Sequence, residues 1–330
     1  MNKKTILVIT NKYDPDTDLV IKKLNKLSEN VIRFNTEDFP TKAEFVFDSN
    51  KGNPIAQLYL PHNRIIDLSE IKSIWYRKPK PHLISNQIKN KAFRLFAQRE
   101  SQVVVNGFYE LFKGLWLSHP LKIRSASRKV YQLQLAVKLG FQIPITLITN
   151  NPKKAKKFCL KYEQKKVITK PLSFPLAEEK SEYYTFSTSC IREKDLENID
   201  QVKYTPTLFQ IRVPKKYELR INVVGNKIFV CEIHSQVSEK TKLDWRLFDQ
   251  KNPIPHKIGK LPREIKEKCI RLVKDMGLLF GAIDMIVTPD NNYVFLEINP
   301  TGVWGWIEEL TGLPISQAII DLLVSGKKEN

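Results

Sequence analysis

Two acidic residues near the C-terminal end of the chain have the types and the spacing of metal ligands. Residues 281–300 form two apolar, β-rich arms around a polar cluster, and this pattern predicts a β-hairpin. A turn centred on 290–291 would place Asp284 opposite Glu297, with the Cβ atoms about 5 Å apart. Asn299 lies two residues after Glu297 and therefore points to the same face. Two carboxylates and an amide oxygen from adjacent strands suit Mg²⁺.

A solvated polar face of an edge hairpin is the alternative interpretation of these residues. The predicted register also puts Ile286 and Phe295 on the face of the carboxylates. Apolar neighbours of this kind favour a face that is partly covered. We therefore expect a metal site rather than a solvated edge.

Three cationic residues earlier in the chain complete a set that suits phosphoryl transfer. Lys170 ends the β-rich segment VITK before a proline, where a lysine can hold phosphates as a point charge. Arg220 lies in YELR, on a predicted hairpin that turns at Gly225-Asn226, and Arg246 lies in LDWR beyond it. Phosphoryl transfer depends on cations at the transferring group and on carboxylates that hold the metal. Each residue alone has a structural explanation, so the hypothesis depends on the order and spacing of the whole set.

The composition indicates a globular protein with room for two or three domains. The chain has 330 residues, of which 42% are hydrophobic and 27% are charged. No apolar run reaches the roughly 18 residues of a membrane span. The N-terminal residues turn polar too early for a signal peptide. The four cysteines are scattered without a CxxC pair, which predicts reduced thiols in a cytoplasmic protein without structural zinc.

A formal net charge of +19 is the strongest compositional signal. Such a surface attracts polyanions, which include nucleic acid, anionic lipid and acidic peptides. The sequence contains neither zinc-finger spacing nor an RNP-type aromatic motif. We therefore expect neither nucleic acid nor a membrane as a partner. The alternative of another class is a basic protein that binds nucleic acid or an anionic surface and keeps a vestigial nucleotide site.

Hydrophobic periodicity predicts alternating strands and helices. Residues 4–35 read as strand, helix and strand, with a helix cap at 16–18. The first connection, 11–16, contains no glycine, so the dinucleotide-binding fingerprint is absent. A single amphipathic helix is expected over 124–139, with Gly140 as its C-cap. The other predicted elements are a strand at 73–79, a helical region at 85–118, a helix at 152–162, a flap at 173–206 and helices near 262–276 and 315–325.

Several motifs together resemble the ATP-grasp superfamily, and within it the graspetide synthetases, the microviridin-type omega-ester and omega-amide peptide macrocyclases. The resemblance covers almost the whole chain and rests on ILVITNKYDPDTDLVIKKL, IRFNTEDFP, IWYRKP, LGFQIPITLITNNP, VITKPLS, LFQIRVPKKYELRINVVGNKIFVCEIHSQ, KLDWR and FLEINPTGVWGWIEELTGLPIS. It implies an α/β ATP-grasp fold of three parts. These are an N-terminal Rossmann-like pre-ATP-grasp domain (1–118), a central lobe with a mobile loop (119–209) and a C-terminal lobe with the magnesium and phosphate site (210–330).

The same resemblance implies an ATP site. Lys170 would contact the phosphates, and a hinge strand would read the adenine through its backbone. Arg220 would bind ATP and, with Arg246, would act catalytically on the γ-phosphate or the acyl phosphate. The hinge residues are Gln210, Ile211, Arg212 and Val213. Ile211 stands where the family usually has an acidic residue, so we expect ATP use to survive and ribose contacts to differ.

The resemblance also implies the metal ligands and the reaction. Asp284, Glu297 and Asn299 would hold Mg²⁺, with Glu297 bridging two ions. The chain would be a ligase that turns a side-chain carboxylate of a peptide into an acyl phosphate with release of ADP. A Thr or Ser hydroxyl, or a Lys amine, would then displace phosphate and close a lactone or lactam.

The implied partners are an acidic ribosomal precursor peptide, with leader and core, and a second copy in a homodimer. The candidate peptide contacts are Arg77, Lys78, Lys80, Tyr183 and Tyr184. A basic loop in water is the alternative for the first three. An ATP-grasp ligase that adds an amino acid to a peptide or protein terminus is the enzymatic alternative. It shares the ATP site, so the motifs do not separate the two reactions.

Overall fold

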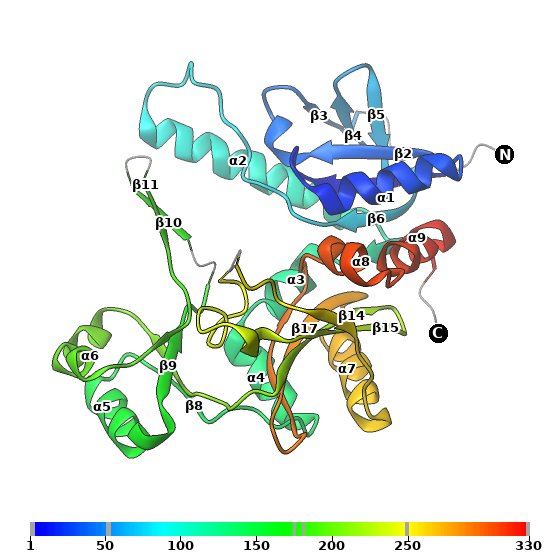
Figure 1. Cartoon of the computed structure of the whole chain (residues 1–330). Helices are drawn as coiled ribbons and strands as arrows, with labels where there is room; N and C mark the ends of the chain where they lie inside the picture. The colour runs from blue at the N-terminus through cyan, green and yellow to red at the C-terminus, as the bar shows by residue number, and fades with distance from the viewer. Residues whose placement is uncertain (1–3, 51–53, 174–175, 180–181, 248–250, 328–330) are drawn as a thin grey trace.

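The computed structural model describes residues 4–50, 54–173, 176–179, 182–247 and 251–327, and it has the expected α/β architecture (Figure 1). Its N-terminal part is built on a four-stranded parallel sheet in the order β2-β1-β6-β7. Every residue of β1 is buried, as expected for an apolar segment in the centre of a parallel sheet. The elements of this part are β1 (Thr5–Thr10), α1 (Pro15–Lys26), β2 (Val31–Asn35), β6 (Ile71–Tyr76), α2 (Lys91–Glu110) and β7 (Leu115–Leu117).

The first helix begins about one turn earlier than the sequence predicts. Pro15 occupies its first position, where the missing N–H leaves no hydrogen bond unmade, and Asp14 is the N-cap residue. The predicted cap at 16–18 therefore lies inside the first turn, where acidic side chains favour the positive end of the helix dipole. An additional three-stranded antiparallel sheet, which was not predicted, follows β2. Its strands are β3 (Glu44–Asp48), β4 (Ile55–Leu60) and β5 (Arg64–Asp67).

The single helix predicted over 124–139 is in fact two helices, α3 (Pro120–Ala126) and α4 (Lys129–Lys138). The side chain of Gln132 donates from Nε2 to the carbonyl of Ala126 at 2.7 Å, which satisfies an acceptor left open at the end of α3. Gly140 follows α4 with φ +75°, the conformation expected of a glycine C-cap. The prediction of one continuous helix was wrong because a side chain replaces the backbone hydrogen bond.

The central part is a four-stranded antiparallel sheet in the order β12-β9-β13-β8. A small apolar core joins the sheet to the helices beside it. The hairpin of β10 and β11 extends away from this sheet (Figure 1), and residues 174–175 and 180–181 of the predicted flap lie outside the described residues. The elements are β8 (Thr146–Thr149), α5 (Pro152–Lys161), β9 (Val167–Lys170), β10 (Leu176–Glu179), β11 (Glu182–Thr185), β12 (Ser189–Cys190), α6 (Glu193–Glu197) and β13 (Thr207–Ile211).

The C-terminal part is a five-stranded antiparallel sheet in the order β16-β15-β14-β17-β18. Helix α7 buries Cys269, Leu272 and Val273 against one face of this sheet. No helix in the described ranges is long and apolar enough to cross a membrane. The elements are β14 (Tyr217–Val224), β15 (Lys227–Ile233), β16 (His256–Ile258), α7 (Arg263–Asp275), β17 (Phe280–Val287), β18 (Tyr293–Asn299), α8 (Gly305–Thr311) and α9 (Ile315–Ser325).

One apolar core joins the N-terminal and C-terminal sheets. Helix α9 packs between them and contacts β6 on one side and β14 on the other. Ile6, Trp75, Phe280 and Ile319 belong to the same buried cluster. The predicted boundary at 118/119 falls between β7 and α3, whereas the boundary at 209/210 falls inside β13. We propose that the second boundary lies in the loop after β13.

The hairpin of β17 and β18 has the predicted register at the carboxylates, because Asp284 pairs with Glu297. The register then shifts, so that Phe295 pairs with Met285 rather than with Ile286. One extra residue at Leu296 is a β-bulge, which turns the following side chain to the other face. Phe295 is therefore buried in the core with α7, and its predicted place beside the carboxylates was wrong.

Candidate active site

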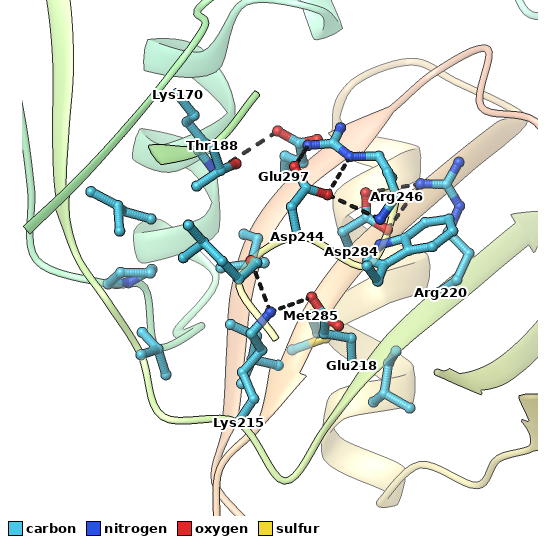
Figure 2. A pocket seen from close by; sticks show the side chains of 18 of the residues that line it. Lys170, Thr188, Lys215, Glu218, Arg220, Asp244, Arg246, Asp284, Met285 and Glu297 are labelled. Atoms are coloured by element: carbon cyan, nitrogen blue, oxygen red, sulfur yellow. Dashed lines mark hydrogen bonds and ion pairs between the residues drawn. The ribbon is translucent and has the colours of Figure 1, made fainter. Parts of the chain in front are cut away.

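A cavity of 280 Å³ lies between the central sheet and the C-terminal sheet (Figure 2). The residues predicted for ATP and metal binding come together around it from strands far apart in the sequence. Lys170 ends β9, and the hinge begins in the last two residues of β13. Arg220 lies on β14, and Asp284 and Glu297 lie on β17 and β18. The lining includes Lys170, Gln210, Ile211, Arg212, Val213, Arg220, Arg246, Asp284, Glu297 and Asn299.

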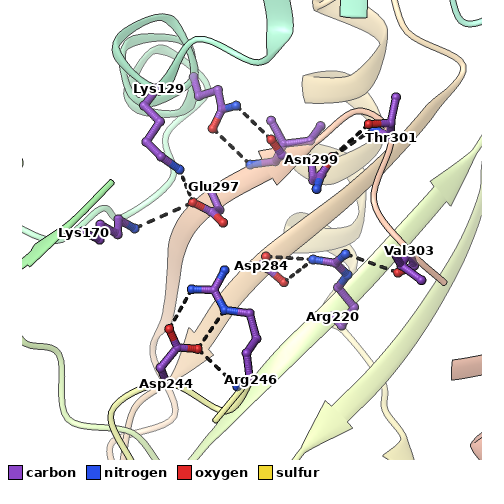
Figure 3. Close-up of polar contacts among 12 residues, drawn as sticks. Lys129, Lys170, Arg220, Asp244, Arg246, Asp284, Glu297, Asn299, Thr301 and Val303 are labelled. Atoms are coloured by element: carbon purple, nitrogen blue, oxygen red, sulfur yellow. Dashed lines mark hydrogen bonds and ion pairs between the residues drawn. The ribbon is translucent and has the colours of Figure 1, made fainter. Parts of the chain in front are cut away.

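Arg220, Asp284 and Glu297 form one row across three neighbouring strands. Arg220 donates from Nη1 to both oxygens of Asp284, at 2.9 and 2.8 Å (Figure 3). Burial raises the pKa of Asp284, although the guanidinium of Arg220 opposes this effect. Positive charge beside Asp284, such as that of Arg220, favours the ionised form of its carboxyl.

Glu297 is held by two ammonium groups. Lys129 donates to its Oε2, and Nζ of Lys170 lies 3.9 Å from the same oxygen (Figure 3). Burial by itself raises the pKa of Glu297, but the charges of Lys129 and Lys170 outweigh it and hold the pKa well below its usual range. Burial lowers the pKa of Lys170, because the charged amine is desolvated. Glu297 is thus held by Lys129 and Lys170, while Asp284 is held by Arg220.

Helix α4 supplies two site residues that the sequence analysis missed. Lys129 is its first residue. Gln132 donates from Nε2 to the carbonyl of Ile298 at 2.8 Å and accepts at Oε1 from the N–H of Ile298 at 3.2 Å. A lysine at a helix N-terminus opposes the helix dipole. Because the predicted helix over 124–139 puts Lys129 in its interior, this position could not single out Lys129 before the structure was known. Gln132 carries no sequence signal either, since its partner lies 166 residues away.

Arg246 reaches the cavity while paired with a neighbouring carboxylate. It donates from Nε and Nη2 to the two oxygens of Asp244, at 2.8 and 2.7 Å (Figure 2). The hydrogen bonds that Arg246 donates to Asp244 raise the pKa of Arg246 further, so the guanidinium keeps its charge. Its side chain is 56% exposed, in contrast to the buried Arg220. Asp244 was not predicted as a site residue, and it fixes the direction of Arg246.

A second buried ion pair, Lys215 with Glu218, lines the cavity at 2.8 Å and was also missed (Figure 2). Lys215 also donates to the carbonyl of Leu243 at 3.1 Å. Burial raises the pKa of Glu218, and Lys215 opposes the effect. This pair connects the loop before β14 with the segment that carries Asp244 and Arg246.

The hinge residues differ in how much of their backbone is already used. The N–H of Ile211 donates to Ile145 O at 3.0 Å, and that of Arg212 donates to Lys166 O at 2.9 Å. In the described parts of the chain, the N–H of Val213 has no such partner. Gln210 is buried, with its Nε2 bonded to Thr146 Oγ1 at 2.8 Å. Of these N–H groups, that of Val213 is therefore the one available to a ligand.

The loop after β18 packs directly against Arg220. Arg220 donates a hydrogen bond from Nη2 to the carbonyl of Val303 at 3.3 Å (Figure 3). A Cβ on Gly302 would lie 2.7 Å from that same Nη2 and 2.4 Å from Ala282 Cβ. The loop can therefore cover Arg220 only because position 302 has no side chain. Asn299, at the start of the loop, accepts from the N–H of Thr301 at 3.0 Å.

The structure does not support a peptide contact for Arg77. Its side chain is 2% exposed and pairs with Asp16, so it lies inside the protein. Lys78 is half-buried, and burial lowers its pKa. Lys80 is exposed, with Nζ 5.8 Å from the ring centre of Tyr13. Tyr183 and Tyr184 are exposed on β11 and do not line the cavity.

The donor set of Asp284, Glu297 and Asn299 fits Mg²⁺. In the described residues, no group of three or more His, Cys, Asp or Glu side chains could hold a metal. A metal here would therefore use the amide oxygen of Asn299 beside two carboxylates. Mg²⁺ takes one or two carboxylates and keeps several waters, whereas zinc sites use His and Cys.

The geometry suits the binding of a polyphosphate beside a metal. Lys129, Lys170 and Arg220 are mostly buried beside the two carboxylates, and Arg246 lies on the more exposed side of the site. Charges fixed in such a site stabilise negative charge on a transferring phosphoryl group. The neighbouring apolar lining, which includes Ile168, Met285 and Leu296, suits a flat base.

Comparisons with known proteins agree with this description. The family model described as MvdD pre-ATP grasp domain matches residues 5–124. The macrocyclase MdnC, bound with precursor peptide MdnA, from Microcystis aeruginosa MRC is 33% identical, with a TM-score of 0.86 over 97% of this chain and 99% of that chain. A RiPP-associated ATP-grasp ligase from Chryseobacterium gregarium, in complex with ADP and a leader and core peptide, is 33% identical, with a TM-score of 0.89 over 99% of each chain. Macrocyclase MdnB from Microcystis aeruginosa MRC is 32% identical, with a TM-score of 0.80 over 97% of this chain and 99% of that one. Comparison with curated protein sequences gives no match.

Proposed function

The chain belongs to the graspetide synthetases of the ATP-grasp superfamily, and on this premise we propose that it closes rings in an acidic, ribosomally made precursor peptide. Enzymes of this family are ATP-dependent ligases that form ester or amide bonds. We propose ester formation with Thr or Ser as the main reaction and amide formation with Lys as the second. The observation that carries the proposal is the row of Arg220, Asp284 and Glu297 on neighbouring strands, with Lys129 and Lys170 held at Glu297.

The reaction proceeds in two steps that balance. An oxygen of an Asp or Glu side chain in the peptide attacks the γ-phosphorus of ATP, the bond to the β-phosphate oxygen breaks, and ADP leaves an acyl phosphate behind. The hydroxyl or amine of a second side chain then attacks the acyl carbon. The carbon–oxygen bond to phosphate breaks, and inorganic phosphate takes up the proton that the nucleophile loses.

Each cationic side chain of the site has a role in these two reaction steps. Lys170 and Lys129 bind the phosphates, whose negative charge compensates for the desolvation of the Lys170 ammonium. Arg220 and Arg246 stabilise the negative charge that develops on the transferring phosphoryl group. Arg246 is the more exposed of the two arginines, so we assign it to the side of the cavity that the peptide enters.

Asp284, Glu297 and Asn299 are the residues that would hold Mg²⁺. Bound Mg²⁺ supplies positive charge that neutralises the triphosphate as the carboxylate approaches. Lys129 and Lys170 keep Glu297 ionised and therefore ready to bind a cation. The N–H of Val213 donates a hydrogen bond to the adenine. Ile211 is apolar, so the ribose has no acidic partner at that position.

The peptide partner is proposed from charge. A net charge of +19 attracts an acidic chain, and Lys78 and Lys80 lie on the segment that leads away from Arg77. Weak dependence of precursor binding on salt concentration would contradict this electrostatic attraction. A homodimer is proposed for the assembly from family membership alone.

Intact mass spectrometry of an acidic candidate precursor, incubated with enzyme, ATP and Mg²⁺, tests the proposal. Each ring closed removes the mass of one water, and mild base opens esters while amides survive. Chelation of Mg²⁺ and the variant Glu297→Gln should both abolish the loss of mass. The control Glu267→Gln, an exposed carboxylate on α7, should not. A gain in mass would instead indicate ligation of an amino acid.

A further inference from the structure

A second hollow, outside the catalytic cavity, lies in the N-terminal part. The segment before α2 loops beside the N-terminal end of that helix (Figure 1), and the space between them measures 560 Å³. We call it the α2 groove. Its lining is Pro81, His82, Leu83, Ile84, Asn86, Lys89, Lys91, Arg94, Leu95 and Gln98.

The charged side chains of the α2 groove are all positive. Lys89, Lys91 and Arg94 line it, and no Asp or Glu does. Arg94 donates to Asn86 Oδ1 at 3.1 Å, and none of the three cations forms an ion pair within the described ranges. Lys91 is the first residue of α2, where a positive charge opposes the helix dipole. Folding alone therefore does not explain this cluster of cations.

The α2 groove also exposes apolar surface. Leu83 is 57% exposed and Leu95 is 47% exposed, on opposite walls of the hollow. His82 forms part of the floor, with Nδ1 donating to Thr36 O at 2.7 Å, so Nε2 of the neutral ring is an acceptor. That Nε2 has no hydrogen-bond partner in the described residues. Cations beside exposed apolar side chains suit a peptide with acidic and apolar side chains.

A short, fixed segment joins the α2 groove to the catalytic cavity. At one end Arg77 donates to the carbonyl of Thr301, in the loop that covers Arg220. At the other end His82 enters the groove. Asn11 bonds Lys78 O at 2.6 Å, and Thr36 bonds both the N–H and the O of Lys80, at 2.9 and 2.7 Å. Five residues of extended chain reach at most about 18 Å.

We propose that the α2 groove binds an acidic, partly apolar segment of the substrate peptide while another part of the same peptide reacts. This inference rests on the proposed function and adds a second binding site to it. The groove would hold the peptide by carboxylates on Lys89, Lys91 and Arg94 and by apolar side chains on Leu83 and Leu95. Because residues 77–82 tie the groove to the loop that covers Arg220, binding there would limit which carboxylates of the peptide reach the catalytic cavity.

The binding test uses a fluorescein-labelled synthetic peptide of alternating Glu and Leu, and the same peptide with Gln in place of Glu. Lys89→Glu/Lys91→Glu/Arg94→Glu should weaken binding of the acidic peptide about tenfold or more, from the loss of three charge pairs. Since Lys91→Glu favours the helix dipole, the variant should keep its unfolding temperature. The control Lys153→Glu/Lys154→Glu/Lys156→Glu makes the same change in net charge at the exposed start of α5 and should bind like wild type.

The outcomes separate the α2 groove from the proposed function. Equal affinity of both triple variants for the acidic peptide would overturn the inference, as would wild-type affinity for the Gln peptide. An equal loss of affinity for a short single-stranded oligonucleotide would also overturn it, because the site would then be a general polyanion surface. Failure to modify any precursor with ATP, while the groove variant alone loses peptide binding, would refute the proposed function and leave the groove standing.

Discussion

Arg77 and Asp16, which lie 61 residues apart in the chain, form an ion pair inside the protein with 2.5 Å between Nη2 and Oδ2. Their side chains are 2% and 7% exposed. Asp16 also accepts from the backbone N–H groups of Trp304 and Gly305, at 3.3 and 3.2 Å. Since Arg77 also donates to Thr301 O, the pair fixes the loop between Asn299 and α8 to the N-terminal part. The first helix is thereby in direct contact with the loop that follows Asn299.

Removal of either partner of this pair should strongly destabilise the fold. Arg77→Met leaves Asp16 buried with an uncompensated charge, and the expected cost is about 3–5 kcal/mol of unfolding free energy. Asp16→Asn likewise leaves the buried guanidinium of Arg77 without its charged partner. The double variant should be less destabilised than the sum of the single variants, and urea denaturation measures this cycle. Additive effects would show that the pair is not coupled. Arg263→Met, in an exposed pair on α7, is the control and should have no measurable effect.

Two glycines should respond in opposite directions to the same substitution. A Cβ on Gly305 would lie 2.4 Å from Asp16 Oδ1, an atom that cannot move because Arg77 holds its carboxylate. Gly305→Ala should therefore cost about 1–3 kcal/mol. Gly107, inside α2, has no atom within 4 Å of its Cβ position, and Gly107→Ala should stabilise by about 0.5–1 kcal/mol. Unfolding temperatures of the two variants measure the difference, and a stabilised Gly305→Ala would contradict the contact with Asp16.

Lys129→Met should slow ATP turnover by about 100-fold, the loss typical when one preorganised donor is removed from a charged site. The substitution also removes the main partner of Glu297. Coupled measurement of ADP release gives kcat and the KM for ATP. Lys138→Met, an exposed lysine in the last turn of the same helix, is the control and should keep wild-type turnover. Equal rates for the two variants would remove Lys129 from the site.

The cysteines should react very unequally with a thiol reagent. Burial raises the pKa of Cys159 to about 11 and that of Cys231 and Cys269 to about 12. Only the thiolate is nucleophilic, so these three should stay unlabelled at pH 8 in the folded protein. Cys190 is half-buried and lines a surface hollow, and it should be labelled first. Mass spectrometry after iodoacetamide treatment counts the labels, and Cys190→Ser should lose the fast one. Fast labelling of Cys269 would contradict its burial between α7 and the C-terminal sheet.

Much of the fold follows from local patterns. The buried strand β1, the glycine C-cap at 140 and the hairpin of β17 and β18 depend on residues close together in the sequence. Alternation and turn chemistry therefore sufficed to pair Asp284 with Glu297. The bulge at Leu296 was not predicted, because which residue leaves the ladder depends on how the core behind it is filled.

The sequence by itself determined which residues could do the chemistry. They are Lys170 at the end of β9, Arg220 on β14 and the opposed carboxylates Asp284 and Glu297. Only the tertiary structure decided which partners they have. Lys129 meets Glu297 across 168 residues, Arg77 turns inward to Asp16, and α3 ends where Gln132 caps it. Such contacts join segments that carry no common periodicity, so their energy depends on packing and burial. That is why the opposed carboxylates, Lys170 and Arg220 could be predicted from the chain while Lys129 and Asp244 could not.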